Sequence, residues 1–307
     1  LILNARYAVG KLGMRFEFRG GDGTLLKSVA VFSGWVFLNQ VSDLVTLNAP
    51  SVILAAVSGA SAVAVFAIAV ALRSVFYSLS VTISGLFTPL VNKIVAKNDD
   101  NHELTSLMAR VGRYQALMLW WVLGGFAVVG QWFVSVWAGS EYAEAYWYTL
   151  VMVAAVSVPL VQNTGIEIQR AKNKHKARSL VYVAASAVDL VVTFALACYI
   201  GAWAAVAGYV VYMVLATWLF MNWYYHCCIG LDMLRFWKRV LPVVVACAVP
   251  AVLCMAGTLF LPVADFLGFL GWGVAYTCLC GFLQWKFVLD ESEKGQFRRL
   301  FAKFRKR

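Results

Sequence analysis

The stretch that decides the fold is Ala62–Val81, AVAVFAIAVALRSVFYSLSV, in which Arg73 is the single charged residue. A membrane-spanning helix needs about 20 consecutive, mainly apolar residues, so this stretch alone is long enough to cross a bilayer. Its polar residues Arg73, Tyr77 and Ser80 recur at intervals of four and three residues, which places them on one face of a helix. We therefore predict a helix that spans the membrane and presents one narrow polar face.

The rest of the chain repeats this pattern. Of its 307 residues, 62% are hydrophobic and 13% are charged, whereas a soluble domain is about half apolar and about a quarter charged. The sequence therefore predicts an all-α integral membrane protein with about eight transmembrane helices. The candidates are Val29–Val57, Ala62–Pro89, Tyr114–Trp137, Tyr148–Glu167, Leu180–Ile200, Ala202–Trp223, Val240–Leu261 and Phe266–Leu289.

The cations are segregated along the chain, which has a formal net charge of +11. Lys and Arg precede the first run, occupy every second gap and follow the last run, as the positive-inside rule requires of cytoplasmic segments. We therefore expect both ends in the cytoplasm, and membrane lipids rather than nucleic acid as the partners of these cations. The remaining gaps, which contain no Lys or Arg, are Ser58–Ser61, Ala138–Trp147, Gly201 and Pro262–Asp265.

Three of the predicted helices carry polar side chains at a spacing that places them on one face. Polar groups at membrane depth are costly and usually face a cavity or a partner helix, so we expect the three faces to meet at a shared lumen. Interhelical hydrogen bonding is the alternative for most of the hydroxyl groups. The polar residues are Asn39, Asp43 and Thr46, then Arg73, Tyr77, Ser80, Ser84 and Thr88, then Tyr182, Ser186, Asp189 and Thr193.

Arg73 is the candidate with the most specific chemistry. A guanidinium near the middle of the membrane is suited to holding an anion through paired hydrogen bonds. Asp43 is open between a role in the lumen and a simple buried ion pair with Arg73. Asp189 is a possible lumen or coupling residue that also fits a structural role.

The sequence lacks the motifs of several common catalytic and metal-binding sites. No Ser/His/Asp set or metal-binding set can be assembled at one depth, and no glycine-rich phosphate-binding motif is present. These absences argue against ATP-driven transport by this chain alone, and we expect no metal and no cofactor.

Several short segments resemble the second half of polysaccharide flippases. They are Asn39-Gln40-Val41-Ser42-Asp43, Ala64-Val65-Phe66-Ala67-Ile68-Ala69, Phe87-Thr88-Pro89-Leu90-Val91, Trp137-Ala138-Gly139-Ser140-Glu141-Tyr142 and Gln169-Arg170-Ala171-Lys172-Asn173-Lys174-His175. These flippases are the O-antigen (Wzx-like) and related exporters of the multidrug/oligosaccharidyl-lipid/polysaccharide (MOP) superfamily.

The resemblance implies the second six-helix lobe of a MATE/MurJ-like fold plus two extra C-terminal helices. Residues 1–28 would then be a basic cytoplasmic segment between lobes, 29–225 the lobe, 226–289 the extra helices, and 290–307 a basic cytoplasmic tail. In this tail Phe297, Leu300, Phe301 and Phe304 alternate with Arg and Lys at helical spacing, which predicts an amphipathic helix on the membrane; a frayed basic end is the alternative. The missing first lobe of the same protein would be a partner, and the chain a fragment.

The function that the resemblance implies is translocation of a lipid-linked (undecaprenyl diphosphate) oligosaccharide across the bacterial inner membrane, for O-antigen, lipopolysaccharide or capsular polysaccharide. Arg73 would hold the diphosphate, Asp43 would neutralise Arg73 or couple to a cation, and Asn39 and Tyr77 would meet sugar hydroxyls. Two alternatives are a cation-coupled multidrug exporter of the same superfamily and a membrane-embedded sugar transferase or polymerase.

Overall fold

The computed structural model describes residues 9–10, 23–289 and 294, and this part of the chain is built from helices without a strand. The proposed tail at 290–307 and most of the segment at 1–28 lie outside the described residues. The helices are α2 (Gly23–Val57), α3 (Ala60–Gly85), α4 (Thr88–Lys97), α5 (Asn101–Trp137), α6 (Ala145–Val161), α7 (Asn163–Ala171), α8 (Lys176–Ile200), α9 (Trp203–Tyr212), α10 (Asn222–Tyr224), α11 (Met233–Phe260) and α12 (Phe266–Leu283).

Three of these helices are extended or linked by π-helical turns, and one connection forms a short 3-10 helix. Residues Met213–Met221 and Tyr225–Ile229 join α9 and α10 into a single rod that ends at Ile229. Residues Gln284–Val288 prolong α12, and Ser140–Tyr142 form the 3-10 helix between α5 and α6.

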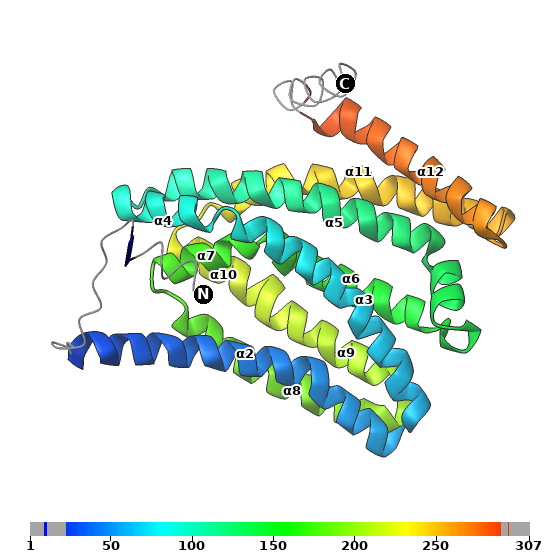
Figure 1. Cartoon of the computed structure of the whole chain (residues 1–307), viewed down its shortest axis with the longest axis horizontal. Coiled ribbons are helices and arrows are strands. Elements are labelled where there is room, and N and C mark those ends of the chain that lie inside the picture. The colour runs from blue at the N-terminus through cyan, green and yellow to red at the C-terminus, as the bar shows by residue number, and fades with distance from the viewer. Residues whose placement is uncertain (1–8, 11–22, 290–293, 295–307) are drawn as a thin grey trace.

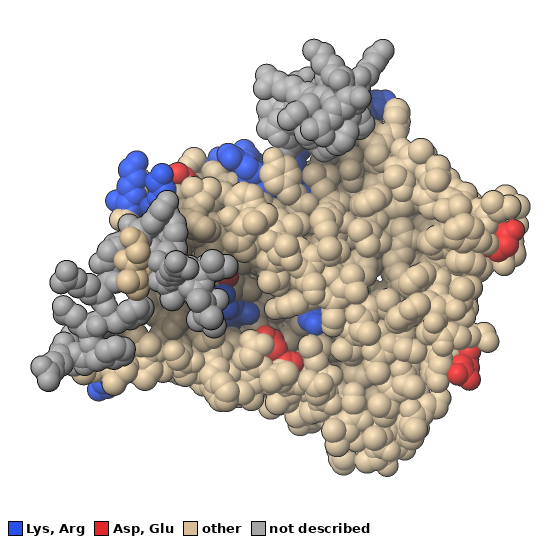
Figure 2. Space-filling view, viewed as in Figure 1, with Lys and Arg blue, Asp and Glu red and all other residues tan. Residues whose placement is uncertain are grey.

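The prediction of an all-α integral membrane protein with about eight spans is confirmed. Within the described residues, seven helices are long and apolar enough to cross a membrane, and the number is eight when the bent pair α6 and α7 is counted as one broken span. Charged residues are also segregated in space. The described connections at one end of the bundle contain no Lys or Arg, whereas those at the other end carry the cations. At the right edge of the molecule in Figure 2, the charged residues in view are all acidic.

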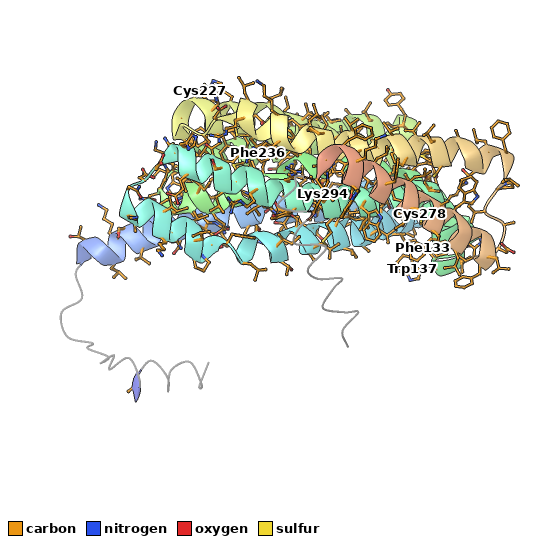
Figure 3. All side chains as sticks on the ribbon, turned by 90° about the horizontal axis from the view of Figure 1, so that it is seen from above. Phe133, Trp137, Cys227, Phe236, Cys278 and Lys294 are labelled. Atoms are coloured by element: carbon orange, nitrogen blue, oxygen red, sulfur yellow. The ribbon has the colours of Figure 1, made fainter. Side chains whose placement is uncertain are left out.

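The helices run roughly along one direction and pack in layers (Figure 1). One layer is the pair α2 and α8; α3, α6 and α9 lie next to it, followed by α5 and α11. Helix α12 lies on the outside against α5 and α11, through the buried side chains of Tyr276 and Cys280. Figure 3 shows Phe133 and Trp137 at the end opposite to Cys227, and their rings stack there 6.0 Å apart.

The second predicted span, Ala62–Pro89, ends earlier than predicted. Helix α3 stops at Gly85, and the chain turns into the short helix α4, which has Pro89 in its first turn. Proline fits the first turn of a helix but lacks the N–H that a helix interior requires. Pro89 therefore begins a new helix that carries Lys93 and Lys97 at the cationic end of the bundle.

The fourth predicted span, Tyr148–Glu167, is broken. Helix α6 ends at Val161, and α7 continues at an angle of 41° to it. Pro159 lies one turn after Ala155 and cannot donate to its carbonyl. The indole N–H of Trp218 donates to that oxygen instead (2.8 Å). A neighbouring helix thus satisfies the backbone group that proline leaves free, as the bilayer interior demands.

A polar cluster fixes the other side of the same break. The Ser80 hydroxyl on α3 donates to the carbonyl of Leu160 (2.7 Å) and accepts from the side-chain amides of Asn163 (2.9 Å) and Gln115 (3.1 Å). This cluster ties α3, α5, α6 and α7 together at one point. As a result α7 is held at its tilt, and the side chains that it carries are directed toward α2 and α8.

A candidate substrate cavity

The cavity lies between the pair α2 and α8 on one side and α3, α7 and α9 on the other. Its mouth pocket, about 110 Å³, is lined from α2, α3, α7, α8 and the connection before α8. Its inner pocket, about 200 Å³, is lined from α2, α3 and the rod that begins with α9. Gln40, Asp43 and Tyr77 line both pockets, so the two form one path. The mouth pocket lies nearer the cationic end, and Figure 2 shows atoms of both charges in a hollow there.

Arg73 lies in the inner pocket with only 6% of its surface exposed. Its Nε donates to the hydroxyl of Tyr209 (2.9 Å), and its guanidinium carbon lies 5.0 Å from the ring centre of Tyr77 and 5.5 Å from that of Tyr209. Neither Nη atom has a hydrogen bond within the described residues, and neither is a fully buried orphan. The guanidinium is therefore anchored at one nitrogen and presents the other two to the cavity.

Asp43 is half-buried at the boundary of the two pockets. Its carboxylate is attracted by the positive charges of Arg178 and Arg73. Neither arginine lies within ion-pair distance of it in the described structure. The alternative in which Asp43 and Arg73 form a closed buried ion pair therefore does not hold in this structure.

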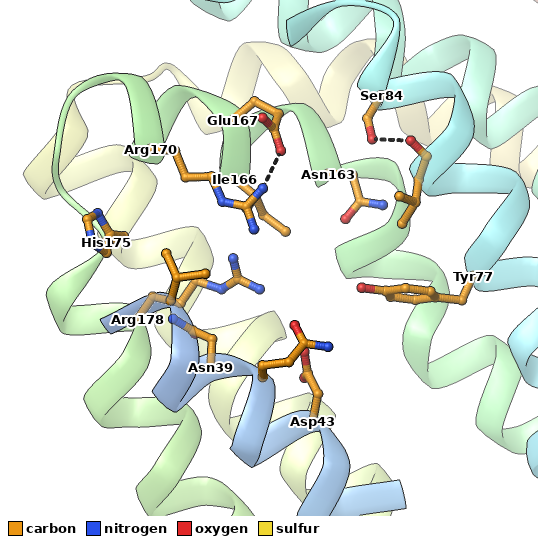
Figure 4. Close-up of a pocket in the computed structure, with 13 residues that line it drawn as sticks. Asn39, Asp43, Tyr77, Ser84, Asn163, Ile166, Glu167, Arg170, His175 and Arg178 are labelled. Atoms are coloured by element: carbon orange, nitrogen blue, oxygen red, sulfur yellow. Dashed lines mark hydrogen bonds and ion pairs between the residues drawn. The ribbon is translucent and has the colours of Figure 1, made fainter. Parts of the chain in front are cut away.

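Asn39 and Tyr77 supply polar groups to the same cavity (Figure 4). Asn39 donates to the carbonyl of Trp35 (2.9 Å) and to the hydroxyl of Ser179 (2.5 Å), which fixes its side chain against α8. Its side-chain oxygen is buried and has no hydrogen-bond partner among the residues that the structure describes. Tyr77 is 40% exposed and lines both pockets. The structure thus brings Arg73, Asp43, Asn39 and Tyr77 together.

Asp189 is separate from this group. It is fully buried between α8 and α9 and lines neither pocket. Thr193 lies near enough to donate to it (3.3 Å), and Gly208 on α9 packs directly against both side chains. The polar face of α2 and much of that of α3 therefore meet at the cavity, whereas this part of the α8 face packs against α9.

Four residues of the mouth pocket with titratable side chains were not predicted as site residues: Glu167, Arg170, His175 and Arg178. Glu167 forms an ion pair with Arg170 (2.8 Å). The helical spacing of Arg178 to Tyr182, Ser186 and Asp189 is the signal that could have identified it. Arg178 extends the polar face of α8 by one turn, toward the cavity.

The comparisons with known proteins support the resemblance in the first half of the chain. Residues 11–147 match a family described as polysaccharide biosynthesis protein. The matched segment includes Asn39, Asp43, Arg73 and Tyr77 and ends before Arg170 and Arg178. No curated protein and no solved structure gives a significant match to the chain. The match supports a role in polysaccharide biosynthesis and covers α2 to α5.

Proposed function

We propose that this chain, whose residues 11–147 match a polysaccharide biosynthesis protein family, translocates a lipid-linked oligosaccharide across the bacterial inner membrane. The substrate class is an undecaprenyl diphosphate sugar used for O-antigen, lipopolysaccharide or capsular polysaccharide. In this proposal the protein is a transporter rather than an enzyme, and the cationic end of the bundle faces the cytoplasm.

The observation that carries the proposal is that the Arg73 guanidinium is buried at the inner pocket with only one nitrogen hydrogen-bonded within the described residues. A buried guanidinium at membrane depth is expensive unless it pairs with a partner or faces a cavity. Arg73 uses one nitrogen on Tyr209 and offers the other two to the inner pocket. A planar group with two free nitrogens matches the oxygens of a phosphate, which it binds in a bidentate fashion. The diphosphate of the substrate is the anion that fits.

The walls of the cavity suit an amphiphilic substrate. Asn39, Gln40 and Tyr77 supply amide and hydroxyl groups to the pockets, and such groups hydrogen-bond sugar hydroxyls. Leu44 is 56% exposed at the inner pocket and adds an apolar surface beside these polar groups. The sugar and diphosphate would occupy the polar path while the polyprenyl tail remains in the lipid beside α2.

The charge of the inner pocket separates this proposal from export of cationic drugs. A cationic drug would gain from Asp43 and would be repelled by Arg73, which lines the same pocket. Replacement of Arg73 by a neutral residue would therefore impair a flippase and improve an exporter of cations.

The test is complementation in cells that lack their own polysaccharide flippase. The chain would be expressed alone and joined to the first lobe of a related flippase, as wild type, Arg73→Ala and Arg73→Lys. Lys97→Ala is the matched control, because Lys97 is an exposed cation at the cationic end of the bundle and lines neither pocket.

We expect loss of surface polysaccharide with Arg73→Ala, partial retention with Arg73→Lys and full activity with Lys97→Ala, at equal amounts of protein in the membrane. Full activity of Arg73→Ala would refute the role of Arg73 as the anion-binding group. Drug resistance that rises in Arg73→Ala would favour the multidrug exporter instead.

A further inference from the structure

The mouth pocket holds two further guanidinium groups, those of Arg170 and Arg178, in addition to Arg73 in the inner pocket. Arg170 comes from α7 and Arg178 from α8, and Figure 4 shows both side chains directed into the pocket. The Arg178 guanidinium lies over the ring of Tyr182, with its carbon 4.6 Å from the ring centre. Its Nε is buried and makes no hydrogen bond within the described residues. Arg178 is thus positioned by an aromatic ring and has a donor to spare.

His175 adds an independent sign that a ligand belongs here. It lines the mouth pocket with 3% of its surface exposed, and neither ring nitrogen has a hydrogen-bond partner among the described residues. Buried polar groups are nearly always paired in folded proteins. The imidazole packs edge-on against the ring of Phe32, with ring centres 4.5 Å apart, and this contact leaves its nitrogens without a hydrogen bond within the described residues. Its position beside two guanidinium groups indicates a site that a ligand with several acceptor oxygens would complete.

Two carboxylates modulate the charge of this pocket. Glu167 pairs with Arg170 (2.8 Å) and lies within 3.3 Å of the Thr88 hydroxyl. Asp43 is attracted by Arg178 without a direct ion pair. Glu167 therefore occupies one of the cations that an incoming anion would use, and it competes with that anion.

We infer that Arg170, Arg178 and His175 form a mouth subsite that binds the diphosphate before it reaches Arg73. This inference rests on the proposed function and adds a second anion-binding station to it. The two stations are joined through Asp43, which lines both pockets and is attracted by the arginine of each. As the diphosphate moves from Arg178 to Arg73, the carboxylate turns to the arginine that has just been vacated, so neither cation is left uncompensated.

Binding of inorganic pyrophosphate to the purified chain tests the subsite without any transport. The affinity would be measured by titration calorimetry in lipid nanodiscs at fixed salt, with orthophosphate as the comparison. Loss of one charge-assisted contact should weaken binding by about tenfold or more in Arg178→Ala. Removal of the competing carboxylate should strengthen binding several-fold in Glu167→Gln. Lys97→Ala should leave the affinity unchanged.

The outcomes separate the subsite from the function. Equal affinities of Arg178→Ala and Lys97→Ala, or no gain in Glu167→Gln, would overturn the subsite. If Arg178→Ala does not fold, Glu167→Gln and Arg178→Lys decide, because both keep the positive charges of the pocket. Pyrophosphate binding that depends on Arg178, together with failed complementation, would leave the subsite standing and remove the flippase. Successful complementation without pyrophosphate binding would overturn the subsite and leave the flippase function standing.

Discussion

Replacing Ser80 by alanine tests how the cavity is held in shape. The Ser80 hydroxyl is fully buried at the break between α6 and α7 and takes part in three hydrogen bonds. The alanine variant loses all three, while the Gln115 amide keeps its bond to the Ser80 carbonyl (3.0 Å). The Leu160 carbonyl and the Asn163 amide lose the partner that Ser80 provides.

The magnitude follows from the number of bonds. Interhelical hydrogen bonds in membrane proteins contribute on average about 0.6 kcal/mol each, so three give about 2 kcal/mol. A buried group left without a partner costs about 1–3 kcal/mol, which places the upper end at about 4 kcal/mol. We therefore expect the free energy of unfolding to fall by about 2–4 kcal/mol in Ser80→Ala.

Ser78→Ala is the matched control on the same helix. Ser78 is exposed, and its hydroxyl donates only to the carbonyl of Ser74 within α3 (2.9 Å). Its replacement should change stability by less than about 0.5 kcal/mol. Unfolding in mixed detergent micelles, followed by the fluorescence of the 12 Trp residues, compares the two variants. Equal stability of Ser80→Ala and Ser78→Ala would refute the structural role of the cluster.

The number of spans could be predicted because the bilayer fixes the length of each apolar run, and the cation pattern needed no tertiary information. The breaks could not be predicted in the same way. Whether Pro159 ends a span depends on Trp218, which lies far along the chain and donates to the carbonyl that proline leaves free. Likewise the second span was predicted to run to Pro89, whereas α3 ends at Gly85 and Pro89 lies in the first turn of the separate helix α4.

The same distinction applies to the site. Arg73 and Asp43 could be found by periodicity, because each lies on the polar face of a single helix. Arg178 was missed because α8 begins at Lys176, before the predicted start at Leu180. Arg170 enters the pocket because α7 tilts by 41° from α6, and that tilt depends on tertiary hydrogen bonds.

Two further predictions concern packing and pH. Gly208→Ala would place its Cβ 2.3 Å from an oxygen of Asp189, so we expect a loss of about 1–3 kcal/mol in the free energy of unfolding. In the control Gly271→Ala the added Cβ has nothing within 4 Å, and stability should not change. Equal stability of the two variants would contradict the close contact at Gly208. Burial, reinforced by the charge of Arg170, lowers the pKa of His175. As pH falls below about 6.5, the imidazole is therefore protonated in the unfolded chain before it is protonated in the folded chain. The free energy of unfolding should then fall on acidification to about pH 5 more steeply in the wild type than in His175→Gln. Identical pH profiles of stability would contradict this assignment.

The most direct test of the central claim is photo-crosslinking in living cells that make a lipid-linked polysaccharide. A photoreactive phenylalanine would replace Tyr77, which lines both pockets, or Phe194, an aromatic residue of α8 that is 67% exposed and lines neither. The flippase account predicts a covalent adduct with the mass of a polyprenyl diphosphate oligosaccharide at position 77 and none at position 194. Adducts of ordinary phospholipid alone at both positions would contradict it.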